Sequence, residues 1–216
     1  SRGLGDVYKR QRLSLTLSVV VMILGVLMMT CDTSAATENK TLDNLMAAYN
    51  GESNAHAKYL AYAQKADEEG YHKVASLFRA AASAEEVHLK NHAQVIKAMG
   101  GAPQADIKLP EIKSTKEDLE DAVKGETYER ITMYPEFITQ AEKDNNPDAV
   151  RTFTYAKAAE AEHAKLYQKA LDNLAEWKAP KADFYVCPVC GFTAEVDAPS
   201  TCPICGTPGK MFKKID

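Results

Sequence analysis

The sequence lacks an excess of basic residues, because 26 lysines and arginines stand against 30 aspartates and glutamates, for a formal net charge of −4. The basic residues are spread among acidic ones and form no long run. Without a general positive field the protein has no electrostatic means of attracting nucleic acid, so we expect no nucleic-acid partner. Its 216 residues are enough for one well-packed core and a small appendage.

Cysteine is also scarce, and the five cysteines are an odd number. Four of them form two Cys-x-x-Cys pairs, Cys187 with Cys190 and Cys202 with Cys205. This spacing is typical of a tetrahedral four-thiolate metal site, an interpretation that we prefer to disulfides. The metal stays open, since zinc predicts a structural ribbon and iron predicts a one-electron carrier.

Charge is absent from one stretch near the N-terminus, residues 13–29, which is an apolar run. A basic flank at residues 9–12 precedes it, and small residues follow it. These three parts are typical of a secretory signal peptide, with cleavage after Ala35 or Ala36. Residues 1–10 show no useful periodicity and do not enter the fold prediction.

Two alternatives for this segment stay open. The run is at the lower length limit for a membrane span, so it can remain as an anchor. The isolated Cys31 can instead become a lipidated N-terminus, although the residues before it match a lipidation signal poorly. We therefore expect an exported protein, in a bacterial periplasm or attached to a membrane, or a cytoplasmic one if the segment is not functional.

From residue 41 onward the apolar residues follow the spacing of long amphipathic helices. Glycines end the first two helices. Ser114 and Glu117 predict a capping box at the start of the third helix, and Pro135 predicts a kink inside it. Pro147 suits the first turn of a fourth helix, which we expect to stop near Trp177.

Four alanine-rich helices with a longer connection at residues 102–113 predict an all-α, ferritin-like four-helix bundle. A small domain with the four cysteines follows the bundle. The predicted organisation is an N-terminal extension at residues 1–36, the bundle at 41–178 and the cysteine domain at 182–216.

Seven glutamates and histidines lie on the apolar faces of these helices, where ionised side chains are costly unless they are paired or bind metal. A Glu-x-x-His step places both ligands on one helix face, and it recurs 33 or 34 residues after a leading glutamate. Five carboxylates and two imidazoles suit two iron or manganese ions. The predicted ligands are Glu52, Glu85, His88, Glu126, Glu129, Glu160 and His163.

Other polar residues near these stripes have two interpretations each. Tyr59 and Tyr134 either donate hydrogen bonds to ligating carboxylates or pack as aromatic side chains. His56 and His92 are interpreted as hydrogen-bond donors behind the ligands or as polar packing residues. We expect His72 at the surface.

The two sites together resemble the rubrerythrin family over residues 41–216. This resemblance implies a ferritin-like diiron domain followed by a rubredoxin-like domain, with two iron ions held by the seven residues above and one iron, or zinc, held by the four cysteines. It also implies an iron that moves between Glu129 and His88. The stretches that carry the resemblance are Gly51-Glu52-Ser53, Ala84-Glu85-Glu86-Val87-His88, Gly125-Glu126-x-x-Glu129, Met133-Tyr134-Pro135 and Ala159-Glu160-x-x-His163.

The activity implied by the resemblance is a peroxidase that reduces hydrogen peroxide to water and protects against oxidative stress. Electrons reach the diiron site through the iron–tetrathiolate centre, and a homodimer brings that centre of one chain to the diiron site of the other. The electron donor stays open, because export would place the chain out of reach of cytoplasmic reductases. Two alternatives remain: a ferroxidase or iron-handling protein, and a non-enzymatic protein with zinc in the four-cysteine site.

Overall fold

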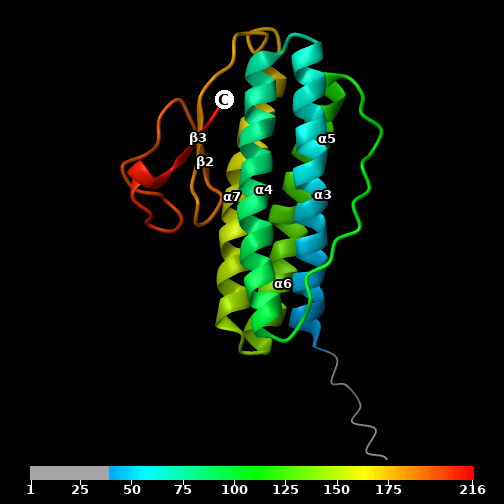
Figure 1. The fold of residues 1–216 in the computed structure, drawn as a ribbon, viewed down its shortest axis with the longest axis vertical. Coiled ribbons are helices and arrows are strands. Elements are labelled where there is room, and N and C mark those ends of the chain that lie inside the picture. The colour runs from blue at the N-terminus through cyan, green and yellow to red at the C-terminus, as the bar shows by residue number, and fades with distance from the viewer. Residues whose placement is uncertain (1–38) are drawn as a thin grey trace, which may run out of the picture. The chain divides into compact units, whose positions relative to one another are not determined.

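The computed structural model of the chain describes residues 39–216. Long helices make up a bundle, and a small sheet with short strands follows them (Figure 1). The helical elements are α3 (Lys40–Glu68), α4 (His72–Ala98), α5 (Thr115–Tyr128), the π-helical turn η1 (Glu129–Met133), α6 (Tyr134–Lys143) and α7 (Pro147–Asp172). The C-terminal elements are β1 (Phe184–Val186), β2 (Thr193–Glu195), the 3₁₀ turn η2 (Gly209–Met211) and β3 (Lys213–Ile215).

The helix boundaries agree with the predicted capping signals. Ser114 and Glu117 form the capping box of α5, each side chain bonding to the other residue's backbone N–H. Asn146 caps α7, accepting from the N–H of Ala149, and Pro147 is the first helical residue. Helices α5 and α7 therefore start where a side chain satisfies one of their free backbone donors.

The third predicted helix is interrupted by a widened turn. The backbone N–H of Tyr134 bonds to the carbonyl of Glu129, five residues earlier, instead of to the carbonyl four residues back. Pro135 follows at once and has no N–H to continue the α-helical pattern. The predicted kink is thus a π-helical turn, a feature that is common at functional sites.

The fourth helix ends before the predicted position. Helix α7 stops at Asp172, because Asn173 leaves helical geometry and its side-chain amide bonds to the carbonyl of Lys169. Trp177 lies beyond the helix in a turn, where it is buried and the ammonium of Lys73 lies 4.3 Å from the centre of its ring.

The core of the bundle consists of two apolar clusters of buried side chains. One contains Tyr59, Phe78 and Tyr167, and the other contains Leu45 and Phe153. Many of the remaining core positions are alanines with no exposed surface, which allows the helices to approach closely. The core thus surrounds the middle of the bundle, where the polar residues of the site gather.

The C-terminal strands form an antiparallel sheet in the order β2-β1-β3. All three strands contact α4, and β2 also contacts α7. Glu195 of β2 forms ion pairs with Lys73 of α4 and Lys169 of α7. The predicted boundaries of the bundle and the cysteine domain stay predictions.

The predicted signal peptide, anchor and lipidation site all lie outside the described residues. Within residues 39–216, none of the helices combines the length and apolar character that crossing a membrane requires.

Candidate metal centres

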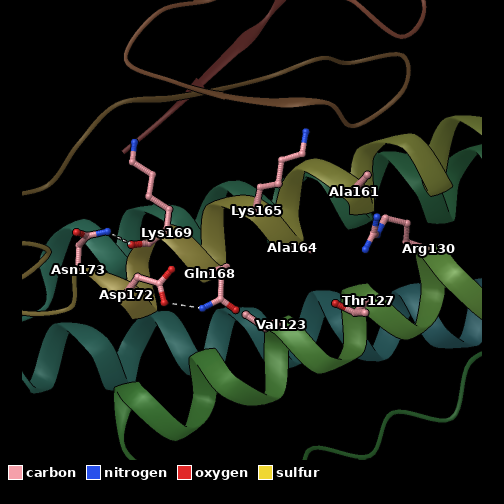
Figure 2. A pocket seen from close by; sticks show the side chains of 10 residues that line it. All are labelled: Val123, Thr127, Arg130, Ala161, Ala164, Lys165, Gln168, Lys169, Asp172 and Asn173. Atoms are coloured by element: carbon pink, nitrogen blue, oxygen red, sulfur yellow. Dashed lines mark hydrogen bonds between the residues drawn. The ribbon is translucent and has the colours of Figure 1, made fainter.

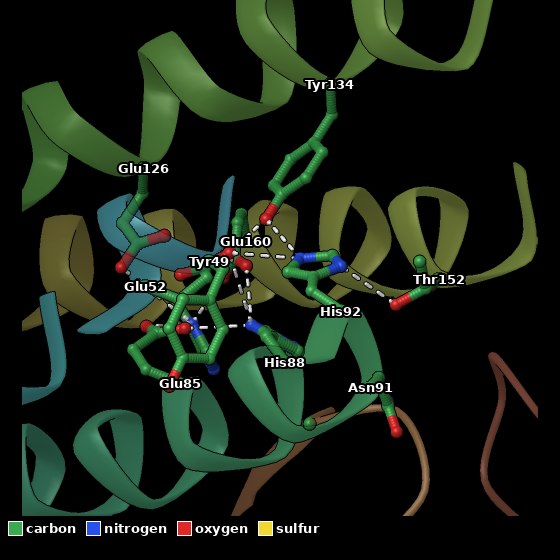
Figure 3. A network of polar contacts seen from close by, with 12 residues as sticks. Tyr49, Glu52, Glu85, His88, Asn91, His92, Glu126, Tyr134, Thr152 and Glu160 are labelled. Atoms are coloured by element: carbon green, nitrogen blue, oxygen red, sulfur yellow. Dashed lines mark hydrogen bonds and ion pairs between the residues drawn. The ribbon is translucent and has the colours of Figure 1, made fainter. Parts of the chain in front are cut away.

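Six of the seven predicted diiron ligands meet inside the bundle. Figure 3 shows Glu52, Glu85, His88, Glu126 and Glu160 among them. Each of these side chains is at most 1% exposed. All four bundle helices contribute, because each turns the face that carries its ligand residues inward. Glu52 comes from α3, Glu85 and His88 come from α4, Glu126 comes from α5, and Glu160 and His163 come from α7.

The first group surrounds His88. Its Nδ1 lies 2.8 Å from Oε2 of Glu85 and 2.9 Å from Oε1 of Glu160. Oε1 of Glu52 is 3.8 Å from the same nitrogen. Three carboxylates and one imidazole thus point at one place, which is a donor set suited to a cation.

The second group surrounds His163 and uses the other oxygens of two of the same glutamates. Nδ1 of His163 lies 2.8 Å from Oε2 of Glu160 and 3.6 Å from Oε1 of Glu85. Oε1 of Glu126 lies 3.8 Å away. Glu85 and Glu160 therefore each present one oxygen to each histidine, the arrangement of carboxylates that bridge two metal ions.

Electrostatics shows that these carboxylates need a positive partner. Burial and the charge of Glu160 raise the pKa of Glu85 and the pKa of Glu126 well above the usual range. Burial acts in the same direction on Glu160, but His88 and His163 outweigh it and lower the pKa of Glu160. Negative charge is thus concentrated beyond what two imidazoles neutralise.

Within the described residues, unpaired polar atoms of the site also indicate that a positive partner is required. Oε2 of Glu52, Oε2 of Glu126 and Oε1 of Glu85 are buried and have no hydrogen-bond partner. Leaving such atoms unpaired is expensive, whereas coordination of metal ions satisfies them. The site fits two ions, and its oxygen and imidazole donors suit iron or manganese.

Glu129, the seventh predicted ligand, lies in neither group. It is the first residue of the π-helical turn, and its side chain is partly buried. Burial, Glu52 and Glu160 raise its pKa well above the usual range, which places it within the electrostatic influence of the site. The ligand roles of individual residues, including exchange between Glu129 and His88, stay predictions.

Tyr59 and Tyr134 are buried, and both reach the carboxylates with their hydroxyl groups. Tyr59 donates to Oε1 of Glu126 at 2.6 Å, and Tyr134 donates to Oε1 of Glu52. Their rings pack at the same time in the aromatic clusters, Tyr59 against Phe78. The two interpretations of these residues therefore hold together.

His92 extends this polar network away from the metal groups (Figure 3). Its Nε2 lies 3.2 Å from the hydroxyl of Tyr134, and its Nδ1 lies 3.0 Å from Oγ1 of Thr152. Thr152 was missed by the sequence analysis, because a threonine on a helix face carries no distinctive signal. His56 contacts the carbonyl of Ala82 instead, and His72 is exposed, as predicted.

The four predicted cysteines come together in the C-terminal domain. They are unbridged, and their sulfur atoms all lie within 4.8 Å of one another. Sγ of Cys187 is 3.5 Å from Sγ of Cys205, and the sulfurs of Cys190 and Cys202 are also 3.5 Å apart. A tetrahedral site with metal–sulfur bonds of about 2.3 Å has sulfur–sulfur distances of about 3.8 Å, so the four sulfurs fit one metal ion.

The turn around the first cysteine pair favours a thiolate at Cys187 and disfavours one at Cys190, because the hydrogen bond with Cys187 and burial raise the pKa of Cys190. Hydrogen bonds from the side chain of Cys190 and from the backbone N–H groups of Val189 and Cys190 lower the pKa of Cys187 to about 4. Metal ligation requires the deprotonated sulfur, so the turn prepares Cys187 for metal, whereas metal binding has to displace the proton of Cys190.

The two centres touch within the chain. Nε2 of His88 lies 3.1 Å from the carbonyl oxygen of Cys190, and the amide of Asn91 donates to the carbonyl of Val189 at 2.9 Å. The resemblance implies such an approach between two chains of a dimer. In the structure it occurs between the bundle and the cysteine domain of one chain.

A surface cavity of about 500 Å³ lies between α5 and α7 (Figure 2). Val123 and Thr127 line one side, Ala161 and Ala164 line the other, and Arg130 lies at one end. None of the predicted ligands lines it. The cavity is therefore separate from the buried metal groups.

Comparison with known proteins agrees with this arrangement of two sites. Residues 43–171 match the family described as Rubrerythrin, and residues 185–213 match the one described as Rubrerythrin, rubredoxin-like domain. Nigerythrin of Nitratidesulfovibrio vulgaris is 39% identical over 186 residues, covering 85% of this chain and 90% of that protein. Rubrerythrin-2 of Clostridium acetobutylicum is 38% identical over 181 residues, covering 80% of this chain and 95% of that protein.

A solved structure of nigerythrin, described as fully reduced and all ferrous, has the same fold. It superposes with a TM-score of 0.76 at 37% identity, covering 86% of this chain and 91% of that one. Together with the carboxylate groups and the four cysteines, these matches decide the family. The chain belongs to the rubrerythrin family and combines a ferritin-like bundle with a diiron site and a rubredoxin-like domain with a four-cysteine metal site.

Proposed function

We propose that this chain is a non-haem diiron peroxidase that reduces hydrogen peroxide to water with electrons delivered through its rubredoxin-like domain. The family consists generally of oxidoreductases, and a rubredoxin-like domain implies electron transfer. The observation that carries the proposal is the hydrogen-bond contact between Cys190 of the four-cysteine site and His88 of the diiron site.

The balanced reaction is H₂O₂ + 2 H⁺ + 2 e⁻ → 2 H₂O. The carboxylates and imidazoles would hold two iron ions, whose chemistry would supply the two electrons and polarise the oxygen atoms of the substrate. The hydroxyls of Tyr59 and Tyr134 hold Glu126 and Glu52 in orientation through hydrogen bonds. Burial of the ligands excludes bulk water and strengthens these interactions.

Electrons enter, in this proposal, through the contact between the two domains. The Cys190 carbonyl accepts the hydrogen bond from Nε2 of His88, so a thiolate ligand and an imidazole ligand are joined by a few covalent bonds and one hydrogen bond. The four cysteines would hold an iron ion, which would supply one-electron chemistry to the diiron site. The donor that reduces the four-cysteine site is unknown.

The relay is tested by exchanging the metal of the four-cysteine site, which leaves the protein intact. Full-length protein is prepared with iron in the carboxylate site and either iron or zinc in the four-cysteine site. Zinc keeps the domain folded but carries no electrons. We expect pre-reduced protein with zinc to consume one equivalent of peroxide in a single turnover and to lose steady-state turnover with an external reductant.

Unchanged steady-state turnover with zinc would refute the relay. The alternatives have different signatures in the same protein. A ferroxidase oxidises added Fe(II) with oxygen at many equivalents per chain, and a non-enzymatic protein purified without oxygen is colourless with one zinc per chain. Metal analysis and a visible spectrum that shows iron–thiolate bands therefore support the peroxidase proposal.

Assembly and location are part of the proposal. We propose a homodimer and an exported protein, in a periplasm or attached to a membrane through its N-terminal segment. Light scattering of purified protein tests the first, since a monomer at micromolar concentration contradicts it. Fractionation of cells that express the full sequence tests the second, since recovery in the cytoplasm alone contradicts it.

A further inference from the structure

Both histidines of the diiron site contact the rubredoxin-like domain through Nε2, the ring nitrogen that faces away from the carboxylates. Nε2 of His88 lies 3.1 Å from the carbonyl oxygen of Cys190. Nε2 of His163 lies 3.0 Å from Oγ1 of Thr193, the first residue of β2. His88, His163 and Thr193 are buried, so water does not replace these contacts.

We propose that the rubredoxin-like domain is a structural part of the diiron site, with Thr193 as the positioning residue of His163 and the Cys190 carbonyl as that of His88. Filling the four-cysteine site should therefore raise the affinity of the carboxylate site for metal. This proposal concerns metal binding and does not depend on which reaction the diiron site catalyses.

The hydrogen-bond chemistry sets both imidazoles in the same orientation. A carbonyl oxygen can only accept, so Nε2 of His88 must carry the proton that it shares with Cys190. The single hydroxyl proton of Thr193 is directed to the carbonyl of Gly191 at 3.2 Å, which leaves Oγ1 to accept from Nε2 of His163. In each ring Nδ1 is then the nitrogen that can offer a lone pair to a metal ion, and it is the nitrogen that faces the carboxylates.

The fit around His88 is close enough to require a glycine. Gly191 has φ +79°, and a Cβ atom on it would lie 2.2 Å from Nε2 of His88. Gly206 occupies the equivalent place after the second cysteine pair with φ +78°, and a Cβ atom there would meet nothing within 4 Å. The two glycines share the same backbone requirement, but only Gly191 lets the domain reach the diiron site.

The rubredoxin-like domain depends on its metal ion for folding. We therefore expect metal binding at the four-cysteine site and metal binding at the carboxylate site to be coupled. The strands of the domain have three residues each, and the buried Cys187, Cys190 and Cys202 form the centre of its own small core. A domain of this size gains much of its folding free energy from metal binding. Because Cys190 and Thr193 take their positions from that fold, metal in one site favours metal in the other, and the coupling is reciprocal.

The test measures Mn(II) binding to full-length protein by electron paramagnetic resonance, with zinc already in the four-cysteine site. Mn(II) prefers oxygen and imidazole donors to thiolates, so it reports on the carboxylate site alone. Thr193→Val removes the hydroxyl at nearly constant shape. We expect it to weaken Mn(II) binding by about 10-fold to 100-fold, the usual effect of losing such a partner, and we expect Thr193→Ser to restore binding.

Gly191→Ala and Gly206→Ala form the matched pair for His88. We expect Gly191→Ala to weaken Mn(II) binding and Gly206→Ala to leave it unchanged, although both variants carry the same backbone strain. Zinc content and circular dichroism verify that each variant keeps its folded domain. If a variant fails this check, the parent protein without zinc and with reduced cysteines is measured in its place. We expect this protein to bind Mn(II) more weakly than the parent protein with zinc.

Two results would overturn the proposal. One is Mn(II) affinity in folded Thr193→Val and Gly191→Ala that equals the parent's. The other is equal Mn(II) affinity of the parent with and without zinc in the four-cysteine site. Loss of the peroxidase relay in the zinc-substituted protein has no bearing on either measurement, so the two proposals fail independently.

Discussion

At the scale of single residues, the diiron site depends on hydroxyl groups that hold its carboxylates. Tyr134 donates to Glu52 and lies 3.2 Å from His92, whose other ring nitrogen lies 3.0 Å from Thr152. Burial and the charge of Glu52 raise the pKa of Tyr134 well above its usual range, so its hydroxyl keeps its proton and remains a donor. The network therefore fixes Oε1 of Glu52, the oxygen that also faces His88, and leaves Oε2 without a hydrogen-bond partner.

We predict that Tyr134→Phe destabilises the protein by about 1–2 kcal/mol, because it leaves a buried carboxylate oxygen without its donor. Tyr167→Phe is the matched control. Tyr167 is equally buried, but its hydroxyl has no hydrogen-bond partner among the described residues, so its loss should be nearly neutral. Urea denaturation measures both free energies of unfolding, and equal effects of the two substitutions would contradict the prediction.

At the scale of elements, two devices bring the ligands of the third helix into place. The π-helical turn sets Glu129 apart from Glu126, which faces the second metal group. At the N-terminal end of α5, the backbone N–H and the hydroxyl of Thr115 donate hydrogen bonds to Glu69, which directly follows α3, at 2.8 Å and 2.7 Å. This contact ties the start of α5 to α3 across the long connection.

The Glu69 contact predicts a pH-dependent stability. The hydroxyl and backbone N–H of Thr115 lower the pKa of Glu69 below its ordinary value. The contribution of ionised Glu69 to the free energy of unfolding is therefore complete above the ordinary pKa of about 4.3. It is lost as the pH falls through the lower pKa of the folded state. We expect Glu69→Gln to reduce stability by roughly 1 kcal/mol at neutral pH, with the difference vanishing in acid.

Glu68→Gln is the control for this measurement. Glu68 is exposed and accepts only from the exposed side chain of Gln64, so its substitution should change little at any pH. Chemical denaturation of the three proteins between neutral and acidic pH gives the comparison. A Glu69→Gln difference that persists unchanged in acid would show that the charge of Glu69 is not the cause.

At the scale of the whole molecule, the rubredoxin-like domain is attached to the bundle by polar contacts around a metal-dependent core. Glu195 pairs with Lys73 at 2.7 Å and with Lys169 at 2.6 Å, and Arg79 donates to the terminal carbonyl of Asp216. These contacts place the domain beside the diiron site, but they do not replace its own small core.

We predict that a chelator that removes the metal of the four-cysteine site unfolds the C-terminal domain and leaves the helices folded. The strands Phe184–Val186 and Lys213–Ile215 should lose protection of their backbone amides, whereas α3 and α4 should keep theirs, because the bundle has a large apolar core. Hydrogen exchange followed by mass spectrometry measures this. Retained protection in the strands would show that the domain folds without metal.

Much of this arrangement follows from local patterns. The helical spacing predicted the bundle, and Ser114 and Pro147 predicted helix starts that the structure confirms. The Glu-x-x-His steps predicted which faces carry Glu85 and Glu160, because residues three apart share a helix face. The end of the last helix was placed too late, since the polar side chain of Asn173 ends it without a strong sequence signal.

The sequence by itself determined the kinds of ligand, their helix faces and the two cysteine pairs, because these depend on spacing within one element. Only the tertiary structure decided that Glu85 and Glu160 each face both histidines, that Glu129 lies outside the two groups, and that Thr193 supports His163. The physical reason is that helical periodicity sets the direction of a side chain but not the depth or rotation at which distant segments pack. Contacts between residues far apart in the chain depend on that packing.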